Sequence, residues 1–185
     1  VVAPDRALVS RTLDAGALGI VLSHADTPEQ ARDLVRWMKY APVGKRGLAM
    51  GPNIDYVQAD AARYCKEANE ATLLILKIES WQGVENAEAM LSNKWVDGVV
   101  FGPGDLAATM GFHGEWKHPE VVRAMDRVSD IALSKGLAVE AAIYPTDYAE
   151  YQRQRERGIQ LFGRFRSCEY DLLREAASRA MSIYR

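Results

Sequence analysis

Two carboxylates, Glu79 and Asp105, follow two neighbouring apolar segments that we expect to form adjacent strands of a parallel sheet. Adjacent strands lie about 4.8 Å apart, so their carboxyl ends would bring these side chains close together. Two converging carboxylates repel each other unless a cation or a shared proton lies between them. A Mg²⁺ ion bound by few carboxylates keeps its other positions for water and substrate oxygens, so the pair indicates a divalent-metal site.

Simpler roles stay open for these residues. Glu79 could be a helix-capping or surface residue, and Asp105 could be the N-cap of a short helix over 106–110. Gly102 and Gly104 would leave backbone N–H groups uncovered beside an ion, and such groups can hold a substrate carboxylate. His24 ends the first predicted strand, where it is either a hydrogen-bonded structural residue or a member of the site.

Short apolar runs alternate with longer amphipathic ones, which predicts a repeated strand–helix unit. The predicted strands are 19–23, 72–78, 96–101, 137–143 and 159–165. The predicted helices are 5–15, 28–39, 55–69, 84–91, 119–135, 146–157 and 170–184, with a loop over 40–53. We expect Thr27 to cap the second of these helices, with Pro28 at its first position.

The apolar strands are nearly continuous, which predicts burial on both faces and a parallel sheet with helices outside it. Five and a half strand–helix units do not close a (β/α)8 barrel, which usually needs about 250 residues. The pattern alone leaves open a doubly wound open sheet or a barrel without its first strands. No Gly-rich phosphate fingerprint follows a predicted strand, which disfavours a nucleotide-binding open sheet.

Length, charge and cysteine content limit the kinds of partner and the cellular setting that we expect for this chain. With 185 residues, the chain fits a single domain of roughly 100–200 residues. Its 23 basic and 25 acidic residues give a net charge of −2, which disfavours nucleic acid and anionic membranes as partners. Cys65 and Cys168 fit no disulfide framework or zinc pattern, so we expect a reducing, cytoplasmic setting. No apolar run is long enough to span a membrane.

Several motifs resemble the HpcH/HpaI aldolase family, in order along essentially the whole chain. They are LDAGALG at 13–19 with IVLSHADTPEQAR at 20–32, KYAPVGKRG at 39–47, LKIESWQGVENAEAM at 76–90, VDGVVFGPGDLAATMGF at 96–112 and HPEV at 118–121. The resemblance implies an α/β fold, a (β/α)8 TIM barrel. Residues 1–185 would be a single barrel domain covering roughly the last five to six strand–helix units.

The resemblance also implies a carbon–carbon lyase that cleaves or forms 4-hydroxy-2-oxo acids through a pyruvate enolate. Its cofactor would be a divalent metal, Mg²⁺ or else Mn²⁺ or Co²⁺, acting as a Lewis acid on the 2-keto oxygen. Carried over by motif, the metal ligands are Glu79 and Asp105. The backbone groups expected to bind the carboxylate of a small 2-oxo acid belong to Gly102, Pro103, Gly104 and Asp105.

Two further residues are expected to take part in catalysis. His24 matches a pocket histidine of some family members and is a titratable base near pH 7. Lys77 stands where the family commonly has Gln, and the period-2 alternation of a strand places it on the same face as Glu79. Lys77 could pair with Glu79, orient a second substrate carboxylate, stabilise the enolate or form a Schiff base.

Two other functions stay open. The same site would suit an oxaloacetate decarboxylase or a related enzyme of secondary metabolism, and an inactive family member could serve as a binding or assembly subunit. Helix 170–184 carries an apolar stripe that must be buried. The resemblance implies that it packs on a neighbouring subunit, which predicts a homo-oligomer, a trimer or hexamer; the alternative is that it covers its own barrel. We also expect about 70 further residues before Val1, with an Arg directly preceding it and a base His on an earlier strand.

Overall fold

The described part of the chain forms a parallel α/β sheet. The structure, a computed structural model, describes residues 5–48, 51, 60–141, 148–162 and 169–182. Within them, a four-stranded parallel sheet has the order β1 (Gly19–Leu22), β2 (Leu73–Ile78), β3 (Gly98–Phe101) and β4 (Ala138–Val139). The helices are α1 (Arg6–Asp14), α2 (Pro28–Met38), α3 (Ala61–Ala71), α4 (Trp81–Leu91), α5 (Pro103–Thr109), α6 (Pro119–Ser134), α7 (Tyr148–Arg157) and α8 (Glu169–Ser182).

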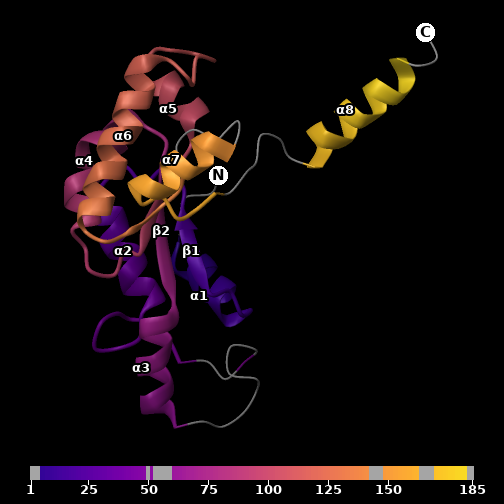
Figure 1. The fold of residues 1–185 in the computed structure, drawn as a ribbon. Coiled ribbons are helices and arrows are strands. Elements are labelled where there is room, and N and C mark those ends of the chain that lie inside the picture. The colour runs from indigo at the N-terminus through magenta and orange to yellow at the C-terminus, as the bar shows by residue number, and fades with distance from the viewer. Residues whose placement is uncertain (1–4, 49–50, 52–59, 142–147, 163–168, 183–185) are drawn as a thin grey trace.

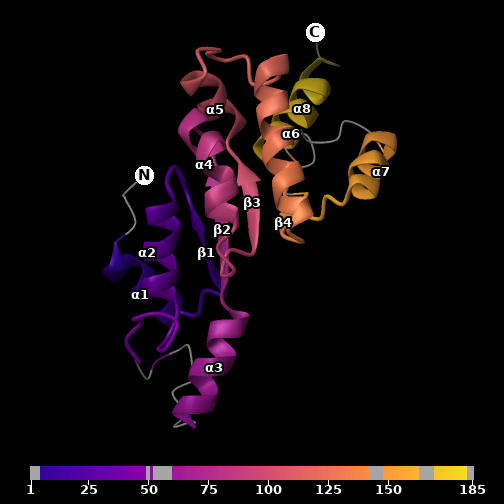
Figure 2. The ribbon, with the colours of Figure 1, turned by 90° about the vertical axis from the view of Figure 1, so that its left-hand side faces the viewer.

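Helices α2, α4 and α6 lie side by side along one face of the sheet (Figures 1 and 2). The side chains of Leu74, Leu76 and Ile78 in β2 are buried, and they alternate with Leu73, Ile75 and Lys77, which are exposed or half-buried. The expectation that the strands are buried on both faces is therefore wrong for β2. The reason is that these three helices pack on the same face and leave the alternate positions less covered.

The sequence of α2 explains both where it begins and which face it buries. Thr27 caps the helix, and Gln30 completes a capping box by accepting the backbone N–H of Thr27 at 2.9 Å. Pro28 occupies the first turn, as predicted. The buried residues recur at helical spacing and are the expected ones, Ala31, Leu34, Val35 and Met38.

Helices α3 and α4 begin at residues other than the predicted ones. Helix α4 begins at Trp81, three residues before the predicted start, because the Ser80 hydroxyl caps it by accepting the Gly83 N–H at 2.9 Å. Helix α3 begins at Ala61, where the Asp60 side chain accepts backbone N–H groups of the first turn, and it extends to Ala71. The predicted start of α3 lies in 52–59, outside the described residues.

The last predicted strands are shorter where the structure describes them. The strand expected at 137–143 is β4, followed by an isolated parallel bridge between Glu140 and Leu161. That bridge is also what the described residues show of the strand expected at 159–165. Gly136 ends α6 with a φ of +72°, as expected for a residue after a helix C-cap. None of the described helices is long and apolar enough to cross a membrane.

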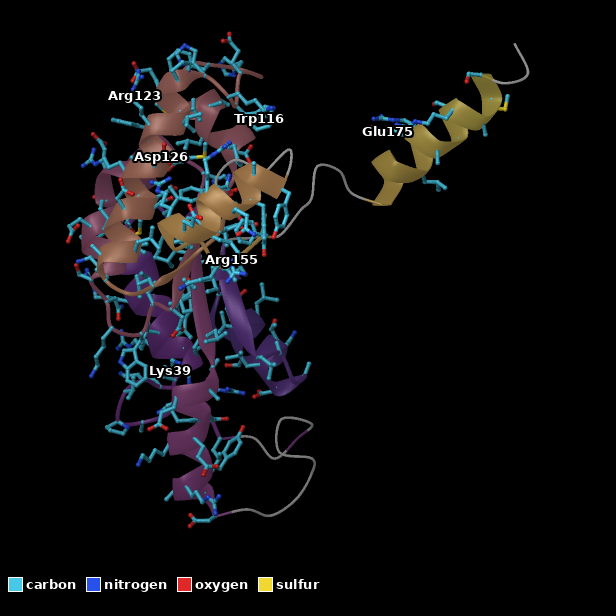
Figure 3. All side chains as sticks on the ribbon, viewed as in Figure 1. Lys39, Trp116, Arg123, Asp126, Arg155 and Glu175 are labelled. Carbon is cyan, nitrogen blue, oxygen red and sulfur yellow. The ribbon has the colours of Figure 1, made fainter. Side chains whose placement is uncertain are left out.

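A buried lysine joins α2 to α3 at the end of the sheet where the strands begin. Lys39 is 1% exposed, and its ammonium donates to the backbone carbonyls of Asn69, at 2.7 Å, and of Thr72. Figure 3 labels Lys39 beside α3, at the opposite end of the body from Trp116 and α5. Burial lowers the pKa of Lys39 below its ordinary 10.5, and the negative charge of Asp97 opposes this shift.

We expect Lys39→Met to lower the free energy of unfolding at pH 7 by about 1–3 kcal/mol, because two buried carbonyls lose their donor. Since folding lowers the Lys39 pKa, the unfolded chain binds more protons between the folded pKa and 10.5, so wild-type stability rises with pH in that window. The stability difference between wild type and variant should therefore widen up to pH 10.5, as measured by urea unfolding.

Lys66→Met, on the exposed side of α3, is the matched control and should show no such widening. Burial raises the pKa of Tyr40 above its ordinary 10.0, which lowers stability above pH 10 in all three proteins and cancels in the comparison. A wild-type advantage that stays constant or shrinks as the pH rises would contradict the role assigned to Lys39.

Candidate functional site

The carboxyl ends of β1, β2 and β3 meet at one edge of the sheet. The register pairs Leu22 with Leu76 and Ile78 with Phe101, so the residues after these strands lie next to one another. The Ala25 N–H continues the pairing beyond β1 by donating to the Lys77 carbonyl at 3.2 Å. This edge therefore collects the predicted site residues His24, Glu79 and Gly102, as expected for ligand sites in parallel α/β folds.

Glu79 is a buried carboxylate at the centre of this edge. Its side chain is 1% exposed, and Oε1 accepts the backbone N–H of His24 at 2.9 Å. His24 has a φ of +49°, a conformation that is uncommon for residues other than glycine, and it turns its N–H toward the carboxylate. The His24 imidazole is 48% exposed with Nε2 3.7 Å from Glu79 Oε1, so it lies at the site and can be reached from solvent.

Lys77 lies on the other side of the same carboxylate. Its Nζ is 2.5 Å from Glu79 Oε2, and its side chain is 33% exposed. The prediction that Lys77 and Glu79 share a face and can pair is therefore confirmed. The ammonium and the carboxylate form an ion pair. Glu79 Oε2 accepts no hydrogen bond of good geometry from the described residues.

Gly102 provides the space that Glu79 occupies. A Cβ at Gly102 would lie 2.4 Å from Glu79 Oε2 and 2.7 Å from Glu79 Cβ, closer than packed atoms can come. The Gly102 N–H donates to the Ile78 carbonyl at 3.0 Å, so it is not one of the uncovered donors that the sequence suggested. Pro103 has no N–H, which leaves those of Gly104 and Asp105 as candidate donors to a substrate carboxylate.

Asp105 lies in the first turn of α5, which begins at Pro103 with Gly102 as its N-cap. The hypothesis that Asp105 caps a helix over 106–110 is therefore wrong, because the Gly-Pro pair starts the helix three residues earlier. Asp105 is exposed, whereas Glu79 is buried. The structure thus brings three of the predicted site residues, His24, Lys77 and Gly102, close to Glu79. Asp105 lies one turn beyond Gly102, in α5.

A polar network that the sequence analysis missed holds the loop containing His24. The Ser80 hydroxyl donates to the Asp26 carboxylate, and the Asn86 side chain donates to the Asp26 carbonyl at 2.7 Å. These bonds tie the loop after β1 to the start of α4, directly behind Glu79. A Ser three residues before Gly83, ahead of an apolar helical run, signals the cap, but no sequence pattern indicates its contact with Asp26.

The donor set at this edge fits a hard divalent cation. Glu79 Oε2 keeps lone pairs that accept no hydrogen bond from the described residues, and Asp105 supplies a second, exposed carboxylate in the first turn of α5. Among the described residues there is no cluster of three or more His, Cys, Asp or Glu side chains suited to a metal. A two-carboxylate set leaves most positions to water and substrate, which is the usual way in which proteins bind Mg²⁺.

The chain is similar in sequence to proteins of a known family. The family model of HpcH/HpaI aldolase/citrate lyase matches residues 1–163. A 2-keto-3-deoxy-L-rhamnonate aldolase of Klebsiella pneumoniae is 35% identical over 123 residues, covering 66% of this chain and 46% of that protein. The chain thus spans about half the length of the curated relatives it matches.

Solved structures show the same similarity in three dimensions. The HpcH/HpaI aldolase from Desulfitobacterium hafniense DCB-2 has a TM-score of 0.85 at 29% identity, covering 98% of this chain and 69% of that one. Macrophomate synthase has a TM-score of 0.79 at 29% identity, covering 98% of this chain and 64% of that one. The expected barrel-type α/β fold is confirmed by the parallel sheet together with these neighbours.

We expect Gly102→Ala to destabilise the protein by about 1–3 kcal/mol, because the new methyl group would overlap the Glu79 side chain. Gly104→Ala is the matched control, since a Cβ there meets no atom within 4 Å and lies in a helix. Its effect should stay within about 0.5 kcal/mol or be stabilising. Urea unfolding of both variants checks this, and equal effects would show that Gly102 is not required for the packing of Glu79.

Proposed function

Because the chain belongs to the HpcH/HpaI aldolase/citrate lyase family, we propose that it forms the metal-binding part of a carbon–carbon lyase. The enzyme would be a class II, divalent-metal-dependent aldolase that cleaves or forms 4-hydroxy-2-oxo acids through a pyruvate enolate. The observation that carries this proposal is the buried Glu79 carboxylate at the common edge of three parallel strands, with Oε2 left for a cation.

Each site residue has a role that its position supports. Glu79 and Asp105 would hold Mg²⁺, Mn²⁺ or Co²⁺, and the bound ion would supply a Lewis acid for the charge that develops on the 2-keto oxygen. The N–H groups of Gly104 and Asp105, in the first turn of α5, would bind the substrate carboxylate. Gly102 would let the backbone pass close to Glu79, because it has no side chain to overlap the carboxylate, and Pro103 would start α5 directly after it.

The bond changes of the cleavage follow from the substrate class. The C3–C4 bond of the 4-hydroxy-2-oxo acid breaks and its electron pair passes into the pyruvate enolate. The C4 hydroxyl loses its proton and becomes an aldehyde, and a proton then adds to C3 to give pyruvate. His24 Nε2, half-exposed and held beside Glu79, can exchange a proton with the substrate.

The substrate class is supported by the named relatives. A 2-keto-3-deoxy sugar acid, as in the name of the Klebsiella relative, is a 4-hydroxy-2-oxo acid. Oxaloacetate decarboxylation at the same site is the second candidate function, and the similarity to macrophomate synthase fits the alternative of a related enzyme of secondary metabolism. Both reactions leave a pyruvate enolate, so the same carboxylates and N–H donors would serve either.

The C-terminal helix supports an assembly of several copies. Helix α8 lies apart from the body of the chain (Figure 1), and its Leu173 and Met181 are 68% and 64% exposed. Large apolar side chains exposed along one helix gain stability when a partner covers them. We therefore propose a homo-oligomer, a trimer or hexamer, in a cytoplasmic setting where the free thiol of Cys65 stays reduced.

The activity is tested by pyruvate release from a panel of 4-hydroxy-2-oxo acids and from oxaloacetate, with Mg²⁺, Mn²⁺ or Co²⁺ added and after chelation. We expect Glu79→Gln to lower kcat/KM by about a hundredfold or more, because the Lewis acid loses a ligand. Glu88→Gln is the control and should leave activity unchanged, because Glu88 is an exposed residue of α4 that pairs with Lys135. Pyruvate release that survives chelation would overturn the metal-dependent proposal.

The assembly is tested by light scattering of the intact protein at micromolar concentration. We expect the mass of a trimer or hexamer, and we expect Leu173→Asp with Met181→Asp to reduce it, because charge on the apolar stripe disfavours its burial. A wild-type protein that is monomeric under these conditions would contradict the proposed role of α8.

A further inference from the structure

Among the residues that the structure describes, Lys77 is the cation closest to the carboxylate that we assign to the metal. In β2 the alternation of side chains places Lys77 two residues before Glu79 on the less covered face. Its Nζ lies 2.5 Å from Glu79 Oε2, while Oε1 is engaged by the His24 N–H at 2.9 Å. The two carboxylate oxygens thus face different partners, a backbone amide and a side-chain ammonium.

A carboxylate that is 1% exposed needs a compensating positive charge. Among the described residues, two side-chain cations lie within ion-pair distance of Glu79, Lys77 at 2.5 Å and His24 at 3.7 Å. The histidine compensates the charge only when its imidazole is protonated. Lys77 therefore supplies the main positive charge beside Glu79 whenever no other cation is bound there.

Two sides of the Glu79 carboxylate are taken up by the described part of the protein. On one side the Gly102 backbone approaches so closely that even a Cβ would lie 2.4 Å from Oε2. On the Oε1 side, the loop at His24 covers the carboxylate. The Lys77 ammonium lies 2.5 Å from Oε2, and two positive charges at one oxygen repel each other, so a metal ion and the ammonium would compete for that oxygen.

We propose that Lys77 is a tethered cation that competes with the divalent metal for Glu79 Oε2, so that the metal binds when the lysine turns away. This inference rests on the proposed function, since it takes Glu79 as a metal ligand. Lys77 then stabilises the metal-free site and sets the metal concentration at which the site fills.

The lysine can leave without disrupting the fold. Its side chain is 33% exposed and has a flexible four-carbon stem, and its contact with Oε2 is an ion pair without hydrogen-bond geometry. Turning the ammonium into solvent therefore breaks one electrostatic contact and leaves the His24 N–H on Oε1. The metal would replace the lost charge at the same oxygen.

The test is metal affinity, measured by isothermal titration calorimetry with Mn²⁺ and Mg²⁺ on chelator-treated, intact protein. Lys77→Gln removes the charge but keeps a donor that can satisfy Oε2, so it should fold and bind Mn²⁺ at least about tenfold more tightly than wild type. Lys77→Arg keeps the charge and should bind the metal with wild-type affinity or more weakly. Before metal is added, Lys77→Gln should melt at a lower temperature than wild type.

Lys135→Gln is the matched control, because Lys135 is similarly exposed, at 28%, and pairs with Glu88 at 2.8 Å away from the site. It should leave metal affinity unchanged. Equal or weaker metal binding by Lys77→Gln would overturn the competition and leave the proposed function standing. If neither wild type nor Lys77→Gln binds Mn²⁺, the assignment of Glu79 as a metal ligand fails as well. Should Lys77→Gln not fold, tighter binding by Lys77→Arg than by wild type would overturn the inference.

Discussion

The burial of the Glu79 carboxylate is the constraint around which the rest of this edge is built. A charge that is 1% exposed is costly unless donors and cations surround it. The chain meets that demand with the His24 N–H on one oxygen and the Lys77 ammonium near the other. Gly102 contributes by lacking a side chain, because any Cβ would occupy the space of the carboxylate.

The loop after β1 is held in the conformation that this arrangement requires. His24 adopts a positive φ, which costs free energy in a residue with a side chain. Hydrogen bonds from Ser80 and Asn86 to Asp26 fix the loop against α4, and they thereby offset that cost. Glu79 is thus held by residues that follow β1 and β3 and by Lys77 in β2, and the loop after β1 is fixed by the N-terminal part of α4.

The two ends of the sheet carry different kinds of buried charge. At the end where the strands begin, the Lys39 ammonium binds backbone carbonyls near the C-terminus of α3 and joins elements of the scaffold. At the other end, Glu79 keeps an oxygen that no described residue satisfies with a hydrogen bond. A buried charge that is hydrogen-bonded to backbone groups serves stability, whereas a buried carboxylate oxygen without a hydrogen bond is suited to binding a cation.

The amino-acid sequence determined the local features. The cap at Thr27, the buried face of α2 and the shared face of Lys77 and Glu79 follow from spacing alone, because helix and strand periods are fixed by backbone geometry. Tertiary structure decided the rest, namely the positive φ of His24, the engagement of the Gly102 N–H by Ile78 and the bond from Ser80 to Asp26. These contacts join residues that are distant in the chain, so they depend on strand register and loop packing, which no local pattern encodes.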